Sequence, residues 1–146
     1  MKKKVIERQP NATGTASMQI EGQPDIRVDA MGVEFHKDEV QVWFGEGRGG
    51  TSEPKQLFRM TLPNKNWHYN FDELKADFFQ YSDIYYFEYH PRAGGADIVV
   101  DKAAKTIKGV FNMKMKEAGG PHLPPPHPQP RPKIMVHGFF DLKSEG

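Results

Sequence analysis

Apolar and polar residues alternate along most of this chain, and a period of two predicts β-strands. The alternation is found in residues 17–22, 25–36, 39–44, 55–63, 83–90, 96–101, 106–117 and 133–143. Its phase changes near Gly32, which favours a bulge or a tight turn there. The polar residues 36–39 then separate two alternating segments, so these segments are expected to form a hairpin.

One stretch departs from this period. It begins at Asn70 and reads NFDELKADFFQY. Asn70 is a favourable N-cap residue, and Glu73 stands at the position from which a capping box closes. Phe71, Leu74 and Phe78 then repeat at helical spacing. The stretch therefore predicts an α-helix of about three turns.

The order of the segments indicates the fold class. Strand signals follow one another without βαβ alternation, so we expect an all-β fold, mainly an antiparallel barrel or sandwich of seven to eight strands, with one short α-helix. Gly109 and Gly138 lie inside strong strand signals and indicate sharp bends or close approaches, as in a curled sheet. The last two segments are similar to the terminal hairpin of small lipocalin-like bacterial proteins over about thirty residues.

The length of 146 residues fits one domain. Residues 1–14 lack periodicity and are expected to form a flexible N-terminal arm, followed by a single β-rich domain at 15–146. Seven of the twelve prolines fall within 121–132, which predicts a stiff Pro-rich loop at 117–132. Too few residues follow this loop for a second domain, so the last segment is expected to complete the same core.

Charge and composition exclude several classes of protein. Twenty basic and nineteen acidic residues are interspersed, so no basic face for nucleic acid is expected. No apolar run reaches the roughly 20 residues that span a bilayer. The basic first residues are not followed by the apolar segment of a signal peptide, and the chain has no cysteine, so we expect a cytoplasmic protein.

Motifs for catalysis fail when their context is considered. Residues 45–50, GEGRGG, match G-x-G-x-x-G, but no helix or βαβ unit is expected after them to bind a pyrophosphate. None of the serines lies in G-x-S-x-G. We therefore expect a protein that is not an enzyme and has no cofactor.

Histidines and acids are the remaining candidate ligands. The six histidines form neither H-E-x-x-H nor an H-x-H pair, so no metal site is expected. Glu88 lies opposite aromatic residues in a predicted strand. Its carboxylate is expected either to face water or, if it faces inward, to need a partner.

Aromatic residues are dense between Trp67 and Tyr89. The two faces of a strand in a single-layer barrel cannot both be buried, so some of the tyrosines are expected to line a cavity or to lie on the surface, where Tyr and Trp are typical of binding faces. The Pro-rich loop also contains P-x-x-P arrangements of the kind that partner proteins recognise, so it is expected either to contact a partner or to be a passive loop that covers the barrel mouth. The expected partner-binding residues are Trp67, Tyr81, Tyr85, Tyr86, Tyr89, Leu123, Pro124, Pro125, Pro126, His127 and Arg131.

The sequence thus favours a non-enzymatic protein-binding β-domain of the accessory, adaptor or immunity/inhibitor type. Its expected partner is another protein or a second copy of itself as a homo-oligomer. The alternative is a lipocalin-like carrier of a small apolar ligand, lined by Phe111, Met113, Met115 and Phe140.

Overall fold

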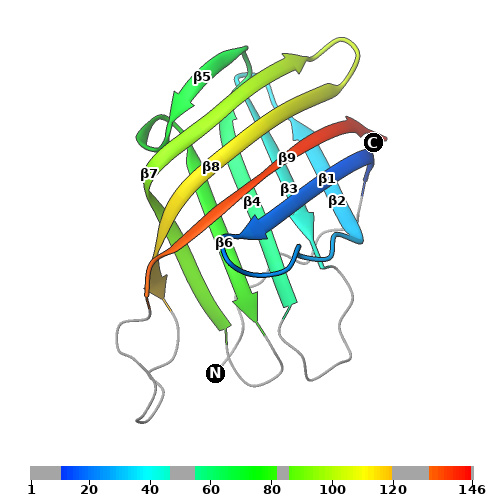
Figure 1. Cartoon of the computed structure of the whole chain (residues 1–146). Coiled ribbons are helices and arrows are strands. Elements are labelled where there is room, and N and C mark those ends of the chain that lie inside the picture. Colours follow the sequence, from blue (N-terminus) through cyan, green and yellow to red (C-terminus); the bar gives the residue numbers. More distant parts are fainter. Residues whose placement is uncertain (1–10, 47–54, 82–85, 120–131, 146) are drawn as a thin grey trace.

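The chain folds into a nearly closed barrel of antiparallel strands (Figure 1). The computed structural model describes residues 11–46, 55–81, 86–119 and 132–145. The strands are β1 (Ala12–Ile20), β2 (Ala30–Phe35), β3 (Glu39–Gly45), β4 (Lys55–Pro63), β5 (Trp67–Asn70), β6 (Lys75–Tyr81), β7 (Tyr86–Asp101), β8 (Thr106–Gly119) and β9 (Ile134–Ser144), with a 3-10 turn, η1 (Phe71–Glu73). The all-β, antiparallel fold is confirmed, and of the two expected architectures it is the barrel.

The order of strands around the barrel is β1-β9-β8-β7-β6-β4-β3-β2, and β5 pairs with β7 at one rim (Figure 1). The expected hairpin is β2–β3. The strands on either side of the Pro-rich segment, β8 and β9, pair directly, so the last strand does complete the core. In the described ranges, no helix has the length and apolarity needed to cross a membrane.

The predicted α-helix is wrong. Within residues 70–81, all of them described, only η1 is helical, and β6 begins two residues after it. Glu73 does accept a hydrogen bond from the backbone N–H of Asn70 (2.8 Å), as in a capping box. The following residues pair with β4 and β7 instead, and the side chains of Ala76 and Phe78 point into the core. The phenylalanines of this stretch fit the helical period and the strand period alike. Burial of alternate side chains in the core therefore outweighs the local helix signal.

A second difference concerns β7. The sequence predicts two strands here, separated by Pro91 and by Gly94–Gly95, but one strand runs through both. The ladder to β8 is irregular between Pro91 and Ala93, where the pairing skips one residue. The skipped residue is Arg92, directly after Pro91, and an irregularity of this kind accommodates a proline, which has no N–H to donate, so β7 continues beyond it.

Aromatic rings fill the middle of the barrel. Phe58 and Phe111 stack with ring centroids 4.5 Å apart, and Phe44 lies within 6.0 Å of both and 5.7 Å from Phe140. All four side chains are at most 2% exposed. Gly109 makes room for this cluster, because a Cβ there would lie 2.4 Å from Cζ of Phe140.

The barrel closes between β1 and β2 without a regular ladder. The backbone N–H of Asn11 donates to the carbonyl of Met31 (3.2 Å), and the side chain of Asn11 bonds to Val33. The N–H of Glu145 donates to the carbonyl of Asn11 (2.6 Å). The expected arm is therefore too long at its C-terminal end, because β1 begins at Ala12 and residues 12–14 belong to the barrel.

Candidate functional site

The expected partner-binding residues do not share one place in the structure. Trp67, at the start of β5, is 60% exposed. Tyr89 is only 1% exposed, and its ring packs inside the barrel 6.0 Å from that of Phe78. Tyr89 pairs with Phe78 on β6, and that face of the pair points inward. Tyr89 therefore does not belong to an outer binding face.

Of the remaining expected residues, two lie in described strands and the others lie outside the described residues. Tyr81 and Tyr86 are paired neighbours on β6 and β7, and their backbones are described. Outside the described residues lie Tyr85, Leu123, Pro124, Pro125, Pro126, His127 and Arg131.

Exposed apolar side chains gather in one hollow on the outer wall of the barrel. In the described part of the chain, four large apolar residues are exposed, by 48 to 61% of their surface. All four line the same hollow of about 630 Å³: Trp67, Val99, Val110 and Phe139. Scattered single apolar residues are normal on a surface, but a contiguous apolar patch is typical of an interaction site.

Strand register explains this hollow. Val110 on β8 pairs with Phe139 on β9, and both side chains point away from the core. Val110 also lines two neighbouring hollows of about 640 and 490 Å³, so it lies at the centre of the face. The sequence carries a signal for these residues that the prediction of an aromatic binding face did not use. Val99, Val110 and Phe139 are apolar residues on the polar side of the alternation.

Charges of both signs surround the apolar residues. Lys108 Nζ lies 3.9 Å from a carboxylate oxygen of Asp141, and both side chains are more than half exposed. His68 Nδ1 lies 2.5 Å from a carboxylate oxygen of Asp97, which pairs in register with Val110. The face thus combines an apolar centre with a mixed-charge rim, the usual anatomy of a protein interface.

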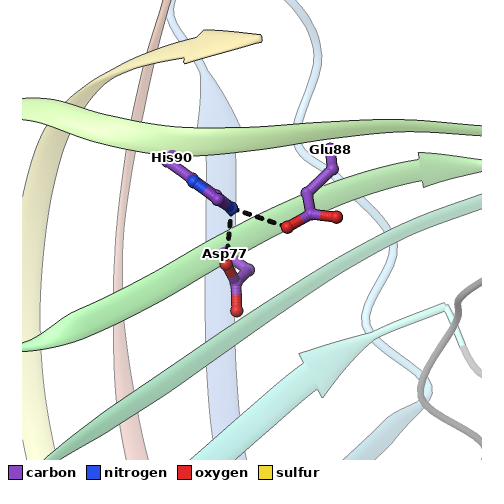
Figure 2. A group of neighbouring side chains, drawn as sticks. All are labelled: Asp77, Glu88 and His90. Carbon is purple, nitrogen blue, oxygen red and sulfur yellow. Dashed lines mark hydrogen bonds and ion pairs between the residues drawn. The ribbon is translucent and has the colours of Figure 1, made fainter. Parts of the chain in front are cut away.

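A second group of side chains lies on the outer wall across β6 and β7. Nε2 of His90 is 2.6 Å from Oε2 of Glu88 and 3.0 Å from Oδ1 of Asp77 (Figure 2). The ligand atoms of these residues all lie within 4.8 Å of one another. Glu88 faces outward, is partly buried and is paired with His90, so of the two expectations for Glu88 the outward one is met.

Arg59 on β4 holds this group in place. Its Nε and Nη2 both donate to Oδ2 of Asp77, at 3.0 and 2.5 Å, which leaves Oδ1 directed at His90. The guanidinium also lies 5.5 Å from the centroid of the Phe79 ring. Phe79 belongs to a small buried cluster on the outer side of the strands, with Ala30, Trp43 and Leu57.

The sequence does not predict this group, because its three members form no contiguous metal-binding motif. Glu88 and His90 are two residues apart on a strand, so the period of two does place both on one face. The third member, Asp77, comes from β6, one residue beyond the Phe78–Tyr89 pair. That juxtaposition depends on a strand register that alternation alone does not determine.

Comparison with models of protein families, with curated proteins and with solved structures finds no match to this chain. The protein class is therefore defined by the fold alone: a nearly closed, antiparallel β-barrel. A barrel of this kind serves many functions, so function has to be argued from the surface and its side chains.

Proposed function

We propose that this chain is a non-enzymatic, accessory protein-binding β-barrel, and that its docking face is the hollow formed by Trp67, Val99, Val110 and Phe139. One observation carries the proposal: in the described part of the chain, every large apolar residue that is exposed lines this hollow. Burying such a face against a partner removes apolar surface from water, which drives association.

The packing of the interior favours protein binding over the carrier alternative. Phe111 and Phe140, expected to line a ligand cavity, lie 6.4 Å apart between ring centroids and contact other buried rings. Met113 and Met115 are fully buried. A carrier needs unfilled space among these side chains, whereas a filled barrel interior acts as a rigid support for its outer surface.

The occupant that we propose for the hollow is a second copy of this chain. A two-fold contact brings the same patch of both copies together, so the patch has to complement itself. The rim meets this requirement because it carries Lys108 together with Asp97 and Asp141, and an ammonium group of one copy then faces a carboxylate of the other. Val110 at the centre of the face packs near the two-fold axis.

Sedimentation velocity over about 1 to 500 µM chain tests the proposal. Wild type is expected to shift from the mass of one 16.7 kDa chain to twice that mass as concentration rises. Val110→Lys places a charge in the contact and should weaken association by at least about tenfold. Thr13→Lys adds the same charge on the exposed part of β1, outside the hollow, and should not.

A wild type that stays monomeric over this range would contradict self-association. Equal association of the wild type and Val110→Lys would instead show that the copies meet through another face. Circular dichroism of each variant, compared with wild type, confirms that the barrel is folded before the masses are interpreted.

A further inference from the structure

Asp77, Glu88 and His90 form a set of side chains that the protein-binding proposal does not use. They lie on the outer wall, from two neighbouring strands, and point toward one another (Figure 2). Each is partly buried, with side chains 18, 24 and 43% exposed in that order. The set offers one imidazole nitrogen and two carboxylate oxygens.

The spacing of these atoms suits a small metal ion. In a tetrahedral site, ligand atoms about 2.0 to 2.2 Å from a common Zn²⁺ lie roughly 3.3 to 3.6 Å from one another. His90 Nε2 is already 2.6 Å from the Glu88 oxygen and 3.0 Å from the Asp77 oxygen. Side-chain rotations that lengthen these two distances by up to about 1 Å therefore open the set around an ion.

The set is also held in position by its surroundings. Arg59 binds the other oxygen of Asp77, and the ring of Phe79 lies beneath the guanidinium. Partners of this kind orient metal-binding carboxylates in known metal sites. Among these four side chains, the two carboxylates outnumber the one guanidinium, which favours a cation between the carboxylates.

We propose that Asp77, Glu88 and His90 bind one Zn²⁺, with three protein ligands. A mixed set of nitrogen and oxygen ligands fits zinc better than magnesium or calcium, which prefer oxygen alone. His90 is 43% exposed, so water completes the coordination from the solvent side. The site is independent of the docking face, because none of its three residues lines that hollow.

Isothermal titration with ZnCl₂ on the full chain tests this site. Wild type is expected to bind one equivalent through it, and His90→Ala should weaken that binding by at least about tenfold, because it removes the only nitrogen ligand of the set. His68→Ala is the matched control. It removes an exposed histidine that contacts a carboxylate, that of Asp97, and binding should be unchanged.

His122 and His127 in the Pro-rich segment also carry imidazoles, so a His122→Ala/His127→Ala variant is titrated in parallel. The site is supported if this variant still binds the one equivalent of zinc and His90→Ala does not. Binding that survives in His90→Ala, or a wild type that binds no zinc, overturns the proposal.

Folding and ligand identity are checked separately. Thermal unfolding without zinc tells whether His90→Ala still folds cooperatively. If it does not, Glu88→Gln takes its place in the comparison, since it keeps the size of the side chain and removes the charge. X-ray absorption at the zinc edge should show one imidazole in the first coordination shell, and a shell without imidazole contradicts the assignment.

Discussion

The side chain of Asn11 bonds to Val33 in both directions. Its Oδ1 accepts a hydrogen bond from the backbone N–H of Val33 (2.9 Å), and its Nδ2 donates to the carbonyl of the same residue (3.2 Å). The amide thus reproduces the pair of hydrogen bonds that a residue on a neighbouring strand would make. Asn11 precedes β1 and Val33 lies in β2, so this contact joins the two strands where the barrel closes.

Replacing Asn11 by alanine should reduce the free energy of unfolding by about 1 to 3 kcal/mol. The partly buried N–H of Val33 loses its partner, and the two edge strands lose their side-chain connection. Urea unfolding of wild type and Asn11→Ala measures the difference. Asn112→Ala, at an exposed position on β8, serves as the control and should change stability by less than about 0.5 kcal/mol.

Alanine at Gly138 should destabilise the barrel more than alanine at Gly109. A Cβ at Gly138 would lie 2.0 Å from the backbone carbonyl oxygen of Ser17 on β1, which cannot move without displacing the strand. At Gly109 the nearest atoms are the tips of Phe140 and Ile98 side chains, which can shift at a cost of about 1 to 3 kcal/mol. Thermal unfolding of the two variants ranks them, and the reverse order would contradict the register of β1 and β9.

Tyr69 should make the barrel less stable in alkali. Burial raises the pKa of its phenol, and the nearby carboxylate of Glu73 raises it further. The unfolded chain therefore releases this proton near the ordinary value of about 10, while the folded chain still holds it. Stability is full below that pH and falls as pH rises above it, because the unfolded state then binds fewer protons.

The comparison variant is Tyr69→Phe. At pH 7 it should lose about 1 kcal/mol, because the hydroxyl donates to the carbonyl of Lys65 (2.8 Å). Above pH 10 its stability should fall less steeply than that of wild type. Urea unfolding at pH 7, 9, 10 and 11 gives both slopes, and equal slopes would exclude Tyr69 as the cause.

The alternation of apolar and polar residues is sufficient to predict the fold class, but not the segments whose structure departs from the local pattern. The face of β8 that carries Ile107, Phe111 and Met113 is buried as the pattern predicts. Phe71, Leu74 and Phe78 fitted a helix equally well, and only pairing with β4 and β7 excludes it. Pairing is a property of segments far apart in the chain, which local spacing does not contain.

The same limit applies to the surface. Exposure of Trp67 was expected, but the inward position of Tyr89 follows from the register of β6 against β7. To predict the hollow around Val110 requires the pairing of β7, β8 and β9. To predict the contact of Asp77 with His90 requires the pairing of β6 and β7. The sequence alone therefore indicates which residue types suit a site, but it does not indicate which of them contact one another in space.

Closure through Asn11 has a consequence for the behaviour of the protein in concentrated solution. An unpaired strand edge is a template on which strands of other chains can add, and aggregation begins at such edges. At Val33 both backbone groups that would serve as this template are already bonded to Asn11. One amide side chain therefore shields this part of β2 from edge-to-edge aggregation.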